Sequence, residues 1–225
     1  MTVLGVDACR GGWVAIGLSD DRSATGLFAA TLDELLSLVG NVEGIAIDIP
    51  LGIPEHGRRA ADVEAKRFVG ARRNSVFFTP VRAALQAPTH AQATVEAKRL
   101  TGYGVSQQAY ALAGKILEAE RWRPQAASPV WEVHPEVSFA VLLGRPARAP
   151  KRTWAGLQQR LDSLERAGID LGGVGEVGQR VAADDVLDAA VAAWSARRLV
   201  DGEGISVPDP PEAHAGTGEP VAIWA

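Results

Sequence analysis

The chain begins with two apolar runs, Val3–Val6 and Trp13–Ile16, which are joined by a short glycine-bearing turn. A strand, a tight turn and a returning strand form a β-hairpin. Asp7 ends the first run, although aspartate is unfavourable in strands and a buried carboxylate needs a hydrogen-bond partner or a metal ion. The alternative is that Asp7 binds the amides of its own turn. The hairpin therefore carries a carboxylate whose partner has to be found elsewhere in the chain.

The following segments extend this hairpin into a larger sheet. Strands are predicted over residues 3–8, 13–18 and 24–30, and a capping box from Thr31 to Glu34 begins a short helix. The run Gly44–Pro50 is almost wholly apolar, as in a strand buried on both faces, and Asp48 lies near its end. Three strands, a helix and a central strand predict an α/β fold.

The middle of the chain, residues 53–125, is more polar and has a helical character. We expect it to form a helical insertion, or cap, over one end of the sheet, within one domain that spans residues 1–225. The helices predicted inside it cover 60–69, a segment that starts at Thr79-Pro80, 91–100 and 106–122.

Strand character returns at Pro129–Pro135, and helices are predicted from Pro135 onward, over 154–167 and over 182–199. The last helix is rich in alanine, and its small side chains would let it lie close to the sheet. The tail from Val207 is rich in proline and glycine, and we expect it to be mostly extended.

Composition and charge exclude several classes of protein. The 225 residues are 47% hydrophobic and 22% charged, which is typical of a soluble globular domain with a sizeable core. Cys9 is the one cysteine, so internal disulfides are excluded and a cytoplasmic location fits. We expect no secretory signal and no membrane span. The net charge of -4 restricts any nucleic-acid contact to local basic patches, and the sequence leaves a homodimer open.

Carboxylates recur at the ends of predicted strands and on the last helix. Besides Asp7 and Asp48, we note Asp185 and Asp188, which share one helix face, and Glu132 on the late strand. Acids in a first helical turn also stabilise the helix dipole, which is the alternative for Asp185. If the strands are neighbours, these carboxylates converge, and they repel one another unless cations neutralise them. Oxygen ligands suit Mg²⁺ or Mn²⁺, and two such ions about 4 Å apart can promote phosphodiester hydrolysis.

A resemblance to a known family rests on stretches spread over most of the chain. These stretches are Gly5–Asp7 with Gly11–Trp13, Ile47–Gly52, Arg72–Phe77, Glu132–Glu136 and Asp185–Ala190. The chain resembles the ribonuclease H-like superfamily and, more closely, predicted RNase H-like nucleases known as domain of unknown function 429. The resemblance implies a mixed sheet, with three antiparallel strands followed by parallel strands and flanking helices. It also implies that Asp7, Asp48, and Asp185 or Asp188 are metal ligands.

Other polar residues are candidates for binding or catalysis. In a strand, His134 faces the same side as Glu132 and would act as a general base or bind phosphate; alternatively it caps the next helix. Arg72 and Arg73 are expected to bind phosphate, and a second basic stretch, residues 145–152, contains no acid. Lys115, in an otherwise apolar helix, reaches either into the cleft or out to solvent.

The function predicted from the sequence is a divalent-metal-dependent phosphodiester hydrolase, in particular a nuclease. Asp7 would bridge two metal ions, Asp48 and Asp188 would complete the site, and Asp185 or Glu132 would be auxiliary. One alternative is a non-catalytic module that binds nucleic acid or a nucleotide. Another is a phosphotransferase related to the actin-like sugar kinases, for which 225 residues are few.

Overall fold

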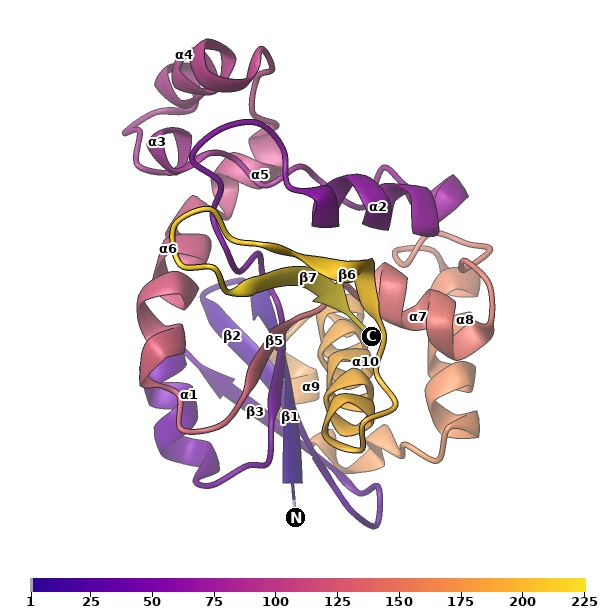
Figure 1. The fold of residues 1–225 in the computed structure, drawn as a ribbon. Coiled ribbons are helices and arrows are strands. Elements are labelled where there is room, and N and C mark those ends of the chain that lie inside the picture. Colours follow the sequence, from indigo (N-terminus) through magenta and orange to yellow (C-terminus); the bar gives the residue numbers. More distant parts are fainter. Residues whose placement is uncertain (1) are drawn as a thin grey trace.

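A computed structural model describes residues 2–225 and contains a five-stranded sheet in the order β3-β2-β1-β4-β5 (Figure 1). Its first three strands are antiparallel, and β4 and β5 run parallel to β1. The strands are β1 (Thr2–Cys9), β2 (Gly12–Ser19), β3 (Ala24–Ala29), β4 (Ile45–Asp48) and β5 (Val130–Glu132). This mixed sheet confirms the predicted α/β class and is consistent with an RNase H-like fold.

Both faces of the sheet are covered by helices, which explains why the central strands are apolar at successive positions. On one face, Leu4 and Val6 of β1 pack with α1 (Leu32–Val39) and α6 (Ala113–Trp122). On the other face, Val3 packs with a cluster formed by α10 (Ala183–Val200) and parts of α7 (Pro135–Leu143) and α8 (Trp154–Arg166). Because successive side chains of β1 point to opposite faces, the strand contributes to two separate hydrophobic cores.

Helix α10 lies directly against β1 because neither element has a bulky side chain at their contact. A Cβ atom added to Gly5 would stand 2.0 Å from the backbone nitrogen of Ala193 and 2.1 Å from the carbonyl oxygen of Ala189. Any other residue at Gly5 would push the helix away. The alanine-rich composition of α10 thus has the effect that the sequence predicted, and it brings the start of the helix close to the end of β1.

The segment after β4 is helical, and most of it lies beyond one end of the sheet (Figure 1). Its elements are α2 (Ala60–Phe68), the 3-10 turn η1 (Gly70–Arg72), α3 (Arg82–Leu85), α4 (His90–Thr101), α5 (Gln107–Ala111), α6 and the 3-10 turn η2 (Arg123–Gln125). Helix α6 differs from the rest because it packs on the sheet itself, where Ile116 and Trp122 are buried.

Two predicted helix boundaries in this segment were wrong. The helix expected to start at Thr79 starts at Arg82, because the hydroxyl of Thr79 donates to Asp62 instead of capping a helix. The single helix expected over 106–122 is interrupted at Leu112. This break lets α5 pack against the α3–α4 cluster through Tyr110, while α6 turns onto the sheet.

The last part of the chain adds 3-10 turn η3 (Leu171–Val174), α9 (Val177–Arg180) and a hairpin formed by β6 (Ser206–Ala213) and β7 (Pro220–Trp224). The tail that the sequence predicted as extended is this hairpin. Val207 and Val221 of the hairpin pack with Ala61 and Ala65 of α2, so the tail holds the start of the helical segment against the domain. Within residues 2–225, no helix is both long and apolar enough to span a membrane.

Candidate metal centre

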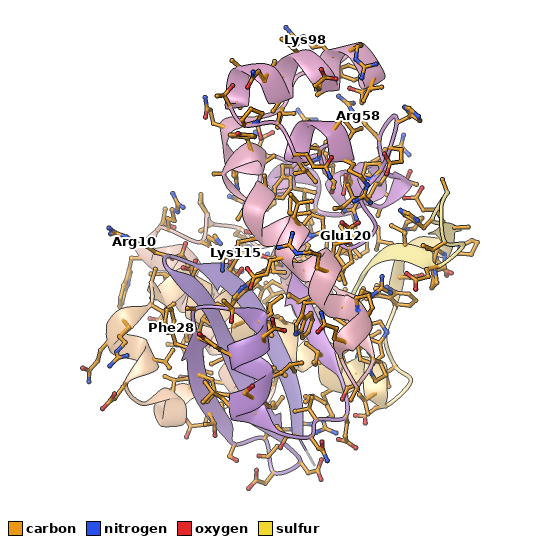
Figure 2. The ribbon with its side chains drawn as sticks, turned by 90° about the vertical axis from the view of Figure 1, so that its left-hand side faces the viewer. Arg10, Phe28, Arg58, Lys98, Lys115 and Glu120 are labelled. Atoms are coloured by element: carbon orange, nitrogen blue, oxygen red, sulfur yellow. The ribbon has the colours of Figure 1, made fainter. Side chains whose placement is uncertain are left out.

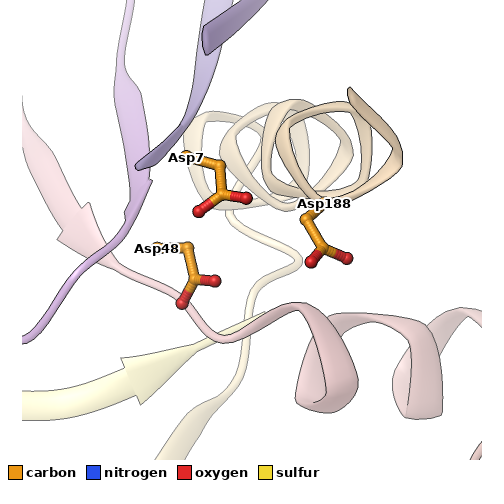
Figure 3. Close-up of side chains that lie close together, drawn as sticks. All are labelled: Asp7, Asp48 and Asp188. Carbon is orange, nitrogen blue, oxygen red and sulfur yellow. The ribbon is translucent and has the colours of Figure 1, made fainter. Parts of the chain in front are cut away.

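Asp7 and Asp48 are direct neighbours in the sheet. Strands β1 and β4 are parallel, and Asp7 is paired with Asp48 at the carboxyl end of the ladder. Because parallel strands end at the same edge, the two carboxylates leave the sheet together (Figure 3). This pairing is the geometric basis of the candidate site.

Asp188 approaches the same point from α10 (Figure 3). It precedes Ala189, whose carbonyl lies against Gly5, so the close helix–strand contact fixes its distance from β1. One carboxylate oxygen each from Asp7, Asp48 and Asp188 lies within 4.8 Å of the other two. We call these three residues the acid trio. Asp7 and Asp188 are buried, and Asp48 is partly exposed.

The three carboxylates are held in an unfavourable electrostatic state. Burial, together with the charges of Asp48 and Asp188, raises the pKa of Asp7 well above its usual value. Burial also raises the pKa of Asp48 to about 7 and that of Asp188 to about 7, although Lys151 opposes both shifts. Carboxylates with such pKa values retain protons near neutral pH, and a cation in their midst would displace those protons.

The chemistry of these donors fits a hard divalent cation. All of them are carboxylate oxygens, the preferred ligands of Mg²⁺ and Mn²⁺. Oδ1 of Asp188 is buried and has no hydrogen-bond partner among residues 2–225. Buried polar atoms are normally paired, so an unpaired oxygen in a cluster of three carboxylates is the kind of atom that a metal ion would satisfy. The acid trio can therefore hold a metal ion.

Lys151 is the cation closest to the acid trio, and the sequence did not single it out. Its Nζ contacts Oδ2 of Asp188 and lies 3.8 Å from Oδ2 of Asp184. Burial alone would lower the pKa of Lys151, but the charge of Asp188 raises it above the usual value. The signal that could have found this residue is its place in the acid-free basic stretch 145–152.

Asp185 lies beside the acid trio without joining it. It lines the same cavity from the first turn of α10, and burial and Asp184 raise its pKa. Its negative charge in turn raises the pKa of Asp7 and of Asp48. The structure therefore brings Asp188, rather than Asp185, into the closest set.

Glu132 is not brought into the acid trio, because it forms a buried ion pair with Arg59. Each carboxylate oxygen of Glu132 accepts a hydrogen bond of 2.7 Å from Arg59, and Oε2 also accepts one of 2.6 Å from the amide of Leu51. Arg59 reaches Asp62 at 2.5 Å on its other side. A carboxylate with this many donors has little capacity left to bind a metal ion.

His134 faces the cavity and also begins α7, which confirms the capping alternative. Its Nδ1 accepts a hydrogen bond of 3.1 Å from the amide of Glu136. Burial lowers the pKa of His134. Because Nδ1 accepts this hydrogen bond, the ring proton lies on Nε2. With Nδ1 occupied, the ring has no free lone pair to act as a general base.

The predicted phosphate-binding residues have different surroundings. Arg72 lines the cavity but donates hydrogen bonds of 3.0 Å and 2.5 Å to the carbonyls of Ala147 and Arg148. Arg73 is exposed and does not line the cavity. Lys115 lies on α6 (Figure 2). Its Nζ is 4.5 Å from the centre of the Trp13 ring and 3.4 Å from Oε2 of Glu118. It is therefore held on the surface of α6 and is not among the residues that line the cavity.

The acid trio opens into a cavity of about 840 Å³. Its walls come from the ends of β1 and β4, the segment after η1, the start of α7, the segment before α8 and the start of α10. Elements distant in sequence thus meet around the three carboxylates, and the cavity is large enough for a nucleotide-sized ligand.

A comparison with protein-family models finds a match to a family described as protein of unknown function (DUF429), over residues 5–213. No curated protein and no solved structure matches the chain. The match runs from β1, which carries Asp7, to the end of β6 and therefore includes every member of the acid trio. The chain belongs to the DUF429 family of proteins of unknown function.

Proposed function

We propose that this chain is a divalent-metal-dependent phosphodiester hydrolase that acts as a nuclease, with Mg²⁺ or Mn²⁺ as its cofactor. The observation that carries the proposal is the acid trio, whose oxygens from β1, β4 and α10 lie within 4.8 Å of one another at a large cavity. Structural carboxylates in a protein interior are normally paired, whereas Oδ1 of Asp188 has no hydrogen-bond partner in the described part of the chain.

The roles of the residues follow from their positions. Asp7, Asp48 and Asp188 would hold the metal, and Asp185 would add negative charge from the cavity wall. Bound there, the metal would polarise a phosphoryl oxygen and lower the pKa of a water molecule. The rigid sheet edge holds Asp7 and Asp48 in register, so little reorganisation would be needed on binding.

The cavity also offers positive groups to a substrate phosphate. Lys151 and Arg152 line it on the side of α10, and the side chain of Arg152 is 87% exposed. Asn74 and Ser75, whose polar side chains can donate hydrogen bonds, also line the cavity. Phosphodiesters are recognised by such charge-assisted hydrogen bonds. These residues support a nucleic acid or a nucleotide as the substrate.

A second candidate is a module that binds nucleic acid or a nucleotide without catalysis. The observation that favours it is the contact of Lys151 with Asp188, because an internal cation already neutralises part of the acid trio. In that case the acids would hold Lys151, and ligand binding would not depend on a metal ion.

The test is a titration of Mn²⁺ and Mg²⁺ into the wild type and the Asp7→Asn variant, followed by calorimetry and by thermal unfolding. We expect the wild type to bind metal and to gain about 2.7 kcal/mol of stability at a free metal concentration one hundred times the dissociation constant. Asp7→Asn should lose both effects. A panel of DNA, RNA and branched substrates, with EDTA as the negative control, then tests for metal-dependent cleavage.

Glu165→Gln is the matched control, because Glu165 is an exposed carboxylate on α8 that is remote from the cavity lining. It should bind metal like the wild type. Metal binding without cleavage of any substrate would favour the non-catalytic module, and ligand binding that survives EDTA would support that module directly. Equal metal binding by the wild type and Asp7→Asn would contradict the assignment of the acid trio.

A further inference from the structure

The segment that carries Lys151 is fixed by hydrogen bonds to its backbone. Arg72 donates to the carbonyls of Ala147 and Arg148, at 3.0 Å and 2.5 Å. The amide of Arg148 donates in turn to Oε1 of Gln159, at 3.0 Å. Arg72 is thus a clamp on this segment, and this contact accounts for an arginine that the sequence had assigned to phosphate binding.

The two residues directly before Lys151 are held from the side of α8. Arg160 donates to the carbonyl of Ala149 at 3.2 Å, and the hydroxyl of Thr153 donates to the carbonyl of Pro150 at 2.8 Å. A Cβ atom on Gly156 would lie only 1.9 Å from that same Pro150 oxygen, so α8 is pressed against the segment. The carbonyls of the four residues before Lys151, residues 147–150, therefore each accept a hydrogen bond from a side chain.

The arginine on α8 is itself buried and anchored. Arg160 is 1% exposed, donates to Oε1 of Glu136 at 2.6 Å, and lies 5.2 Å from the ring of Phe139. A lysine on an exposed loop normally samples many conformations, but this backbone is anchored to α7, α8 and η1. The side chain of Lys151 is only 33% exposed, and its anchored backbone holds the ammonium beside the acid trio.

The charges of the site decide how many further cations it needs. Three ionised carboxylates carry three negative charges, and the ammonium of Lys151 removes one of them. One divalent cation balances the two that remain within the acid trio, whereas two divalent cations beside Lys151 would leave an excess of two positive charges there, of which Asp185 on the cavity wall offsets one. Asp184 also lies near this site, but its carboxylate forms ion pairs with Lys151 and Arg152, so its negative charge is not available to balance a second divalent cation.

We propose that Lys151 takes the place of a second metal ion, so that the acid trio binds a single divalent cation. This inference rests on the proposed function and replaces the two-metal arrangement that the sequence predicted. The ammonium would donate hydrogen bonds to a phosphoryl oxygen as negative charge develops there, the role of the second cation in a two-metal site. Arg72 and Arg160 are then positioning residues that act through Lys151.

The test counts the Mn²⁺ ions bound per chain, by calorimetry and by electron paramagnetic resonance. The wild type should bind one ion and show no coupling between neighbouring Mn²⁺ centres. Lys151→Met, which keeps an unbranched side chain one atom shorter but removes the charge, should bind two. Lys151→Arg keeps the charge and should bind one. Lys115→Met is the matched control, a half-buried lysine outside the cavity, and should also bind one.

The outcomes separate this inference from the proposed function. Two coupled ions in the wild type would overturn the role of Lys151 and leave a metal-dependent hydrolase intact. One ion in Lys151→Met, at any affinity, would also overturn it. If Lys151→Met does not fold, Lys151→Gln replaces it, and the wild-type count remains decisive. No metal binding by any variant would contradict the proposed function as well.

Discussion

Two groups of buried carboxylates meet the same cavity, and they differ in how completely they are paired. Asp62 and Glu132 share Arg59, and all four of their oxygens accept hydrogen bonds from Arg59, Thr79 or Leu51. Among residues 2–225, the acid trio has Lys151 as its only ion-pair partner, and one oxygen of Asp188 has no hydrogen-bond partner. Every oxygen of the first group therefore has a donor, whereas the second group has a carboxylate oxygen left that could bind a further cation.

This difference shows that burial alone does not identify a functional carboxylate. Glu132 and Asp7 are equally buried, each at 5% exposure, and both come from strands of the same sheet. Only the number of positive partners separates them. A structural ion pair loses stability when its cation is removed, and an unfinished site gains stability when a cation is added.

The largest effect is expected for Arg59→Met, which removes the shared cation of the first group. Two buried carboxylates would be left without their positive partner, and breaking such a pair costs about 3–5 kcal/mol. Urea unfolding with and without the substitution measures this loss. Arg67→Met is the control, because Arg67 forms an exposed pair with Glu64 and should change stability little. A loss no larger than that of the control would show that the first group does not stabilise the fold.

A smaller effect, of opposite sign, is expected for the acid trio when the pH is varied without metal. The pKa values of Asp48 and Asp188 are raised to about 7 in the folded chain, so between about pH 4 and 7 the folded state binds more protons than the unfolded state. Their contribution to stability is therefore fully present below about pH 4 and is lost as the pH rises through 7.

We expect this loss to be about 1–2 kcal/mol, because the coupled carboxylates share their protons. The measurement is the difference in unfolding free energy between the wild type and Asp48→Asn at several pH values. Asp48→Asn should become the more stable protein, relative to the wild type, as the pH rises. A difference that is independent of pH would show that the carboxylates are not held in an unfavourable state, and saturating Mn²⁺ should reverse the ranking at pH 7.

The strand ends that position Asp7 and Asp48 could be predicted from the sequence because local patterns mark them. The apolar runs that end in Asp7 and Asp48 indicate the ends of two strands, and the alanines of α10 indicate a helix that lies close to the sheet. Once β1 and β4 pair in parallel, these residues meet at one edge without further information. The same reasoning places Asp188 on the helix that crosses Gly5.

The pairings of long side chains could not be predicted in this way. Arg59 and Glu132 are 73 residues apart, and Lys151 and Asp188 are 37 apart. The side chains of arginine and lysine are long and flexible, so the neighbouring sequence does not specify which carboxylate they bind. For that reason the sequence assigned Glu132 to the metal site and did not assign Lys151 to it, and only the packed structure distinguishes the two.

The smallest effect is expected for Arg72→Ala, and it tests whether the acid trio depends on the segment that holds Lys151. The substitution removes two hydrogen bonds from a partly exposed guanidinium to backbone carbonyls, which should lower the free energy of unfolding by about 1 kcal/mol. Arg73→Ala is the matched control, because the neighbouring guanidinium is exposed and does not line the cavity. If Arg72 positions Lys151, its loss also weakens the competition of the ammonium for Asp188, and Mn²⁺ should bind more tightly to Arg72→Ala than to Arg73→Ala. Equal metal affinity in the two variants would mean that Lys151 reaches Asp188 without this clamp, and Arg72 would then again be a candidate for phosphate binding.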